Sequence, residues 1–155
     1  MKISRDFLLG ILVLAADQWS KKSAMDAGMV TINRGGALGI QFSGFASRLL
    51  DWNQVLTAVS IILLVWIFKQ MKKWGDQERN WGYLIIFAGV SNIIDRVIWG
   101  GVRDWVELPF FGMKNNLADM FLTASIIGLL ITVYNLQRAE KLEDELARNK
   151  STRLK

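Results

Sequence analysis

The stretch LADMFLTASIIGLLITVYNL, residues 117–136, decides the fold class, because it holds only one charged residue, Asp119 near its start. A helix that crosses a bilayer needs roughly 20 predominantly apolar residues. This run therefore predicts a transmembrane helix with a carboxylate in its first turn.

Three further apolar segments lie at about residues 7–19, 55–68 and 81–98, and the first two reach spanning length only with their polar flanks. Aromatic residues lie near segment ends, as in an interfacial belt: Trp52, Trp66, Trp74, Trp81 and Tyr134. The 155-residue chain thus predicts an all-α membrane domain of four transmembrane helices, residues 1–137, with a charged helical tail, residues 138–155.

Most Lys and Arg residues fall at residues 1–6, 69–80 and 137–155. Cytoplasmic segments of membrane proteins carry an excess of these cations. We therefore expect both termini and the tail to be cytoplasmic, with residues 20–53 and 96–116 on the opposite side. The first segment is expected to remain in the mature protein, because Asp17 and Gln18 do not resemble a cleavage site of small residues.

The first outer segment contains TINRGGALGIQFSGFASRLLDW, residues 31–52. Its first half alternates and is rich in glycine, which predicts short strands and turns. Its second half places Phe42, Phe45, Leu49 and Trp52 at helical spacing, which predicts a helix in the membrane interface. A loop helix that packs on the bundle is an equally good interpretation.

The chain has no His and no Cys, which excludes catalytic triads with His, Cys nucleophiles and the usual zinc sites. The net charge of +5 arises at the ends of apolar runs rather than on a basic face, so no nucleic-acid partner is expected. No metal and no cofactor are predicted. Any catalysis must use Asp, Glu, Lys, Ser, Thr or Tyr.

Polar residues gather at the predicted outer ends of three segments, and they are Asp17, Lys21, Asn92, Asp95, Arg96, Asn116 and Asp119. Each has a structural explanation: Asp17 and Lys21 form an i,i+4 pair, Asn116 caps a helix, and Asp95 pairs with Arg96. Asp104 lies between the last two segments, in a Gly-rich stretch that predicts irregular structure. Together, ionisable groups at this depth are costly and indicate function.

Asp104 and Asp119 are the predicted catalytic pair. Two carboxylates held close together do not both ionise easily, so the pair retains one proton and titrates as a unit. The ionised group can take a proton from water, while the protonated group donates to a scissile carbonyl oxygen. This is the chemistry of an aspartic peptidase.

Five short motifs in order resemble lipoprotein signal peptidase, also called signal peptidase II. They are DQWSK (residues 17–21), NRGGALG (33–39), NIIDR (92–96), VRDW (102–105) and NLAD (116–119). The family cuts the signal peptide from diacylglyceryl-modified prolipoproteins of the bacterial inner membrane, just before the lipidated Cys. The resemblance implies an active site near the extracytoplasmic face, a small β-cradle for the substrate, contact with membrane lipids and inhibition by globomycin-type compounds.

The same resemblance implies a role for each site residue. Asp104 and Asp119 take the catalytic positions, and Asp17 and Lys21 hold the bundle together. The implied substrate-binding residues are Asn33, Gly35, Asn92, Asp95, Arg96 and Asn116.

Several features depart from the family pattern: residues 87–91 read FAGVS where the family has Gly-Gly-Ala-x-Gly, and the segment between Asp104 and Asp119 is somewhat short. Four departures concern single positions. Ser91 stands where the family has Gly, Leu38 where it has Phe, Arg103 where it has an apolar residue, and Asn115 where it has Phe. Neither catalytic carboxylate is affected.

Two other functions remain as alternatives. One is a Ser–Lys peptidase that uses Ser20 or Ser23 with Lys21 or Lys22, although these side chains face differently on a helix. The other is a small transporter or scaffold that uses the polar cluster without peptidase chemistry.

Overall fold

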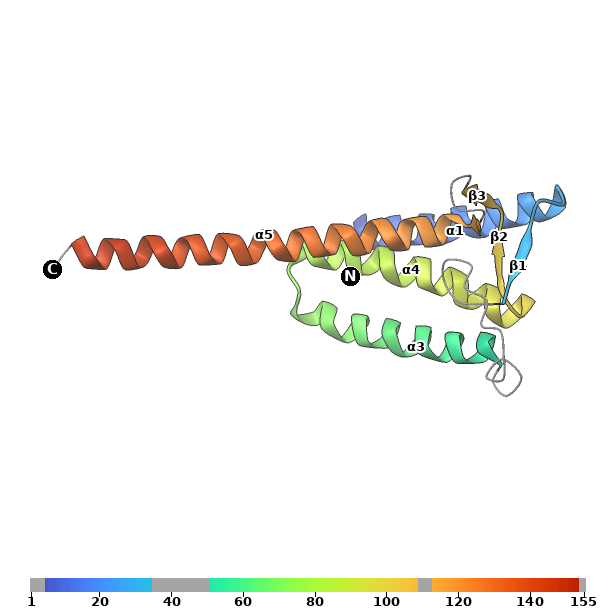
Figure 1. Cartoon of the computed structure of the whole chain (residues 1–155), viewed down its shortest axis with the longest axis horizontal. Helices are drawn as coiled ribbons and strands as arrows, with labels where there is room; N and C mark the ends of the chain where they lie inside the picture. The colour runs from blue at the N-terminus through green and yellow to red at the C-terminus, as the bar shows by residue number, and fades with distance from the viewer. Residues whose placement is uncertain (1–4, 35–50, 109–112, 154–155) are drawn as a thin grey trace.

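The computed structural model describes residues 5–34, 51–108 and 113–153. Four long helices lie side by side (Figure 1). They are α1 (Arg5–Asp26), α3 (Trp52–Gln70), α4 (Asp76–Trp99) and α5 (Leu117–Arg153), and the 3-10 helix η2 (Met71–Lys73) leads from α3 to α4. Four three-residue strands gather at one end: β1 (Thr31–Asn33), β2 (Val102–Asp104), β3 (Val106–Leu108) and β4 (Met113–Asn115).

Among the described residues, three helical stretches are long and apolar enough to cross a membrane: Trp52–Lys73, Asp76–Trp99 and Leu117–Leu146. The three corresponding apolar segments are thus confirmed as helices of spanning length and composition. α1 is 22 residues long, but its second half carries Asp17, Lys21 and Lys22. Its crossing of the membrane, and hence the count of four spans, stays a prediction.

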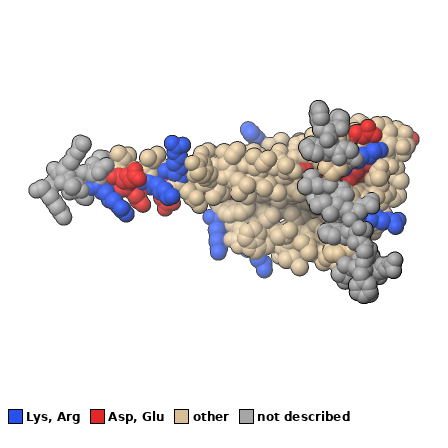
Figure 2. Space-filling view, viewed as in Figure 1, with Lys and Arg blue, Asp and Glu red and all other residues tan. Residues whose placement is uncertain are grey.

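The bundle has a small core and an apolar exterior. Helix α4 lies at its centre and packs against α1, α3 and α5, and the buried residues Val13, Ala88 and Ala118 meet where α1, α4 and α5 touch. Large side chains such as Ile62 and Leu130 are exposed, at 67% and 64%. On the face shown in Figure 2 the body of the bundle carries few charges, as a surface in contact with lipid requires.

The predicted small sheet is confirmed as two antiparallel pairs. β1 pairs with β2 so that Thr31 lies opposite Asp104, and β3 pairs with β4. The prediction that Asp104 lies in irregular structure is wrong, because β2 pairs with a strand about 70 residues earlier in the chain, a partner that local sequence does not show. Gly101 permits this close approach, since a Cβ there would lie 2.7 Å from the Asn33 carbonyl oxygen.

The predicted interfacial helix lies mostly outside the described residues, as do Gly35 and Leu38. Trp52, its last predicted residue, instead begins α3, and the Asp51 side chain caps that helix by accepting from the backbone N–H groups of Asn53 and Gln54.

Helix α5 runs for 37 residues without a break at the predicted domain boundary between residues 137 and 138. At about 1.5 Å per residue it is longer than the roughly 30 Å hydrocarbon core of a bilayer. Its C-terminal part extends well beyond the other helices (Figure 1). The tail is therefore helical, as predicted, and its cytoplasmic location stays a prediction.

Candidate active site

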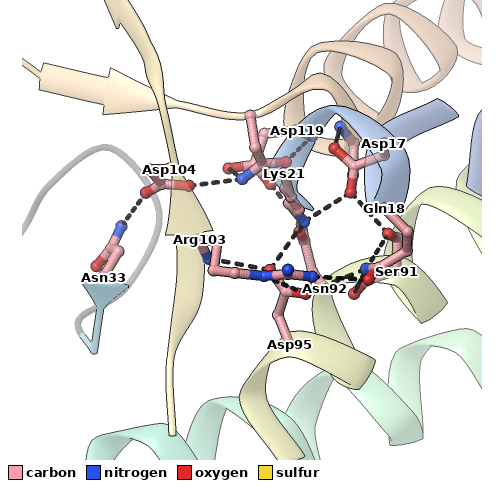
Figure 3. A network of polar contacts seen from close by, with 12 residues as sticks. Asp17, Gln18, Lys21, Asn33, Ser91, Asn92, Asp95, Arg103, Asp104 and Asp119 are labelled. Atoms are coloured by element: carbon pink, nitrogen blue, oxygen red, sulfur yellow. Dashed lines mark hydrogen bonds and ion pairs between the residues drawn. The ribbon is translucent and has the colours of Figure 1, made fainter. Parts of the chain in front are cut away.

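Most of the predicted site residues that the structure describes meet at one end of the bundle, where α1, α4 and α5 approach strand β2 (Figure 3). Helix α1 brings Asp17, Gln18 and Lys21, and the C-terminal part of α4 brings a second set, Ser91, Asn92 and Asp95. The start of α5 and strand β2 complete the cluster. Residues separated by as many as 101 positions are in direct contact here.

Lys21 is the centre of an ionic group within this cluster. Its Nζ lies 2.6 Å from Asp17 Oδ2 and 3.1 Å from Asp95 Oδ2, and it donates to Asn92 Oδ1 at 3.0 Å. The side chains of Lys21, Asp17 and Asp95 are fully buried. The sequence predicted the Asp17–Lys21 pair, and the structure adds Asp95 as the second carboxylate on the same cation.

Asp17 joins three helices. Its Oδ2 accepts the Ser91 hydroxyl of α4 at 2.6 Å, and its Oδ1 accepts the backbone N–H of Ala118 in the first turn of α5 at 2.8 Å. The first N–H groups of a helix have no partner within the helix and favour negative charge nearby. Asp17 therefore fixes where α5 begins.

Asp95 does not form the predicted ion pair with Arg96. Its salt bridges in the described part of the chain are with Lys21 and with Arg103, whose Nη2 lies 2.7 Å from Asp95 Oδ1. The backbone N–H of Arg103 also donates to Asp95 Oδ2 at 3.0 Å, and the Arg103 guanidinium lies 5.3 Å from the centre of the Trp99 ring. The backbone approach of β2 brings residue 103, rather than the adjacent residue 96, against this carboxylate.

Asp104 and Asp119 are held by asparagine side chains instead. Asn116 Nδ2 donates to both carboxylates, at 2.7 Å to Asp104 Oδ1 and 3.2 Å to Asp119 Oδ2. Asn33 donates to the other oxygen of Asp104 at 2.9 Å, and Asn92 donates to the other oxygen of Asp119 at 2.7 Å. One nitrogen atom therefore contacts both predicted catalytic groups.

Asn116 also caps α5, as the sequence predicted. Its Oδ1 accepts the backbone N–H of Asp119 at 2.9 Å. The Asn115 side chain accepts the backbone N–H of Asn116 at 2.9 Å. The cap and the bridge use different atoms of the same amide, so the helix start and the spacing of the two carboxylates are fixed together.

The electrostatic environment of Asp104 differs from that of Asp17 and Asp95. Within the described residues, no Lys or Arg lies within ion-pair distance of Asp104 or Asp119. Asp104 is only 2% exposed. Burial raises its pKa above the ordinary value, and the hydrogen bonds from Asn116 and Asn33 offset this only in part.

Arg96 is the last of the predicted site residues that the structure describes. The backbone oxygen of Arg96 accepts from Asn53 Nδ2 at 3.1 Å, and its buried Nη1 has no partner among the described residues. Sequence reasoning assigned no role to Gln18 or Asn53, although Gln18 lies inside the DQWSK motif. In the described parts of the chain, no three acidic side chains are arranged as metal ligands.

These features define a class: a helical membrane protein with a buried, carboxylate-rich polar site at one end of its bundle. The family model of signal peptidase (SPase) II matches residues 9–135, which is most of the chain. The chain belongs to the signal peptidase II family.

Individual relatives agree with this assignment. The chain is 35% identical over 100 residues to a lipoprotein signal peptidase of Synechococcus sp. (strain RCC307), a match that covers 64% of each chain. It is 26% identical over 148 residues to that of Campylobacter jejuni subsp. jejuni serotype O:23/36 (strain 81-176), covering 88% of this chain and 90% of the relative. The match to the Synechococcus protein and those to two further relatives each span less than two thirds of the relative's length.

The fold also resembles a solved structure. A bacterial membrane enzyme determined at 1.9 Å by the in meso method superposes with a TM-score of 0.66 at 23% identity, covering 83% of this chain and 91% of the other. At this identity the likeness establishes the fold alone.

Proposed function

We propose that this protein is an aspartic endopeptidase that removes signal peptides from diacylglyceryl-modified prolipoproteins, cutting before the lipidated Cys. The observation that carries this proposal is the pair Asp104 and Asp119, bridged by Asn116 Nδ2 and without a cation partner among the described residues. Neutral amide donors hold the two carboxylates close together without forcing both to ionise.

The proposed reaction uses one shared proton. The ionised carboxylate takes a proton from a water molecule, whose oxygen attacks the scissile carbonyl carbon. The protonated carboxyl donates its proton to the carbonyl oxygen, which gives a neutral tetrahedral intermediate. When that intermediate collapses, the C–N bond breaks, the leaving nitrogen takes the proton of the now protonated carboxyl, and the other carboxylate takes a hydroxyl proton as the carbonyl re-forms. The pair returns to its one-proton state.

Substrate contact is assigned to the residues around this pair. The side-chain amides of Asn33 and Asn92 donate to Asp104 and Asp119, respectively, and hold these carboxylates in place when a peptide binds. The Arg96 guanidinium has an unpartnered buried nitrogen, which suits a peptide carbonyl. Gly35 is assigned to the same substrate cradle by family resemblance. Asp95 supports β2 through its bonds to Arg103, and its substrate contact remains a prediction.

The test is cleavage of a lipidated prolipoprotein by the purified full chain in detergent. We expect the wild-type protein to release the signal peptide in the presence of chelator, and globomycin to block release. Asp104→Asn is the matched inactive variant. Failure of the wild-type protein to cleave, or cleavage that depends on added metal, would exclude this function.

We also propose that the site faces the extracytoplasmic side of a bacterial inner membrane, with both termini in the cytoplasm. The support is the Lys and Arg bias and the position of η2 at the opposite end from the strands (Figure 1). The chain has no Cys, so single cysteines at Gly75 and Glu107 report topology directly. An impermeant thiol reagent should label Glu107→Cys and not Gly75→Cys in intact cells, and the reverse pattern would invert the orientation.

A further inference from the structure

Two of the positions that depart from the family pattern, Ser91 and Arg103, are joined by one side chain. Gln18 Oε1 accepts from Arg103 Nη2 at 2.7 Å, and Gln18 Nε2 donates to Ser91 Oγ at 2.8 Å. Gln18 thus connects strand β2 with helix α4 from its place on α1 (Figure 3).

The path of contacts extends to the residues that precede both catalytic carboxylates. Ser91 Oγ donates to Asp17 Oδ2, and Asp17 Oδ1 accepts the backbone N–H of Ala118, the residue before Asp119. Arg103 is the residue before Asp104. The unbroken path therefore begins one residue before one carboxylate and ends one residue before the other: Arg103, Gln18, Ser91, Asp17 and Ala118.

Strand β2 is held in position by β1 and by the contacts of Arg103. It is three residues long, and β1 is its strand partner among the described residues. Asp95 accepts from both the side chain and the backbone N–H of Arg103, so the chain just before Asp104 is held at two points. Arg103 and Asp104 are consecutive in a strand and point to opposite faces. Arg103 can therefore anchor the strand while Asp104 faces Asn116.

We propose that Arg103, Gln18 and Ser91 act as one positioning unit that sets the spacing between Asp104 and Asp119. This inference rests on the proposed function. Arg103 and Ser91 touch neither carboxylate of the pair and act through the strand and the helix start. A displacement of about 1 Å in a catalytic group can cost about a hundredfold in rate.

The experiment compares Arg103→Leu, Arg103→Lys, Ser91→Gly and the double variant Ser91→Gly/Arg103→Leu. Single-turnover cleavage and its substrate dependence are measured per folded molecule, with the folded fraction taken from thermal melting in the same detergent. We expect Arg103→Leu to lower kcat by about 10- to 100-fold with little change in KM. Arg103→Lys should recover part of that loss, because it keeps the charge opposite Asp95 but not the planar fork.

Coupling is the sharper readout. If the three residues form one unit, Ser91→Gly should lower kcat on its own and add little to Arg103→Leu, because residues in one hydrogen-bonded network are not independent. Arg79→Leu is the matched control, since Arg79 is likewise an arginine paired with an aspartate, Asp76, but lies at the end of α4 far from strand β2. It should leave kcat unchanged.

Two results would overturn the inference. One is a melting temperature that falls in Arg103→Leu while kcat per folded molecule stays at the wild-type value, which means a purely structural role. The other is additive losses from Ser91→Gly and Arg103→Leu. Both are read against a cleaving wild-type protein and an inactive Asp104→Asn, so they are distinguishable from failure of the proposed function.

Discussion

The cluster contains four buried or half-buried aspartates in two different environments. Asp17 and Asp95 are paired with cations, Lys21 and Arg103. Asp104 and Asp119 are held by the amides of asparagines. The two pairs lie in one network, because Lys21 also donates to Asn92, which donates to Asp119.

The difference matches the two proposed roles, structural for Asp17 and Asp95 and reactive for Asp104 and Asp119. A cation within about 3 Å neutralises a carboxylate and holds its oxygens in place, which favours a structural role. Amide donors satisfy the oxygens of a carboxylate but allow it to gain or lose a proton. Aspartate side chains thus connect helices in one half of the cluster and form a candidate acid–base pair in the other half.

The largest expected effect is loss of the amide-held pair. Asp104→Asn and Asp119→Asn should each lower kcat by at least about a thousandfold, since either change removes the shared proton. The double variant should be hardly worse than either single one, because residues that act as a unit are not additive. Single-turnover cleavage by all three variants checks this. Substantial turnover by Asp104→Asn would place the reactive group elsewhere.

Breaking the cation-held pair should affect folding instead of chemistry. Asp17→Asn leaves Lys21 buried with one fewer anion, which we expect to cost about 3 kcal/mol of unfolding free energy. Thermal melting and the yield of folded protein measure this cost. Turnover per folded molecule should stay well above that of Asp119→Asn. A well-folded Asp17→Asn protein without activity would contradict the division between the two pairs.

The sequence predicted much of this arrangement because its strongest signals are local. Apolar runs of spanning length indicated the helices, and the i,i+4 spacing of Asp17 and Lys21 indicated their pair. The Asn116 cap could be read in the same way.

The contacts that were missed are non-local. Nothing near Arg103 in sequence shows that β1 draws β2 against Asp95, or that Gln18 lies between Arg103 and Ser91. Arg103 and Ser91 appeared in the sequence only as departures from a family pattern. The structure gives them a shared partner: Asp95 neutralises the charge of Arg103, and Gln18 accepts from Arg103 and donates to the Ser91 hydroxyl.

A smaller effect should appear in the pH dependence of stability. The raised pKa of Asp104 means that the folded state keeps its proton to higher pH than the unfolded state. Wild-type stability should therefore fall as pH rises from the ordinary aspartate pKa through the raised value, and Asp104→Asn should lack this loss. The stability advantage of Asp104→Asn should grow over that window and then level off. A constant difference between the two proteins across pH would show that Asp104 has an ordinary pKa.

The smallest effect is expected at Lys22, the residue after Lys21 on α1. Lys22 pairs with Asp26 at 3.6 Å with the same i,i+4 spacing as Asp17 and Lys21, but its side chain is 74% exposed while that of Lys21 is fully buried. Exposed pairs of this kind contribute about 0.3–0.5 kcal/mol because water screens them. Lys22→Met should therefore change the melting temperature by about a degree or two at most and leave cleavage unchanged. Lys21→Met removes the cation that Asp17 and Asp95 share, so this variant should fail to fold or should melt at a far lower temperature. Melting of the two variants in parallel compares a buried and an exposed lysine that share the i,i+4 spacing to an aspartate. Equal melting temperatures would mean that the buried ionic group does not hold α1 to α4, and the structural role assigned to Asp17 and Asp95 would be lost with it.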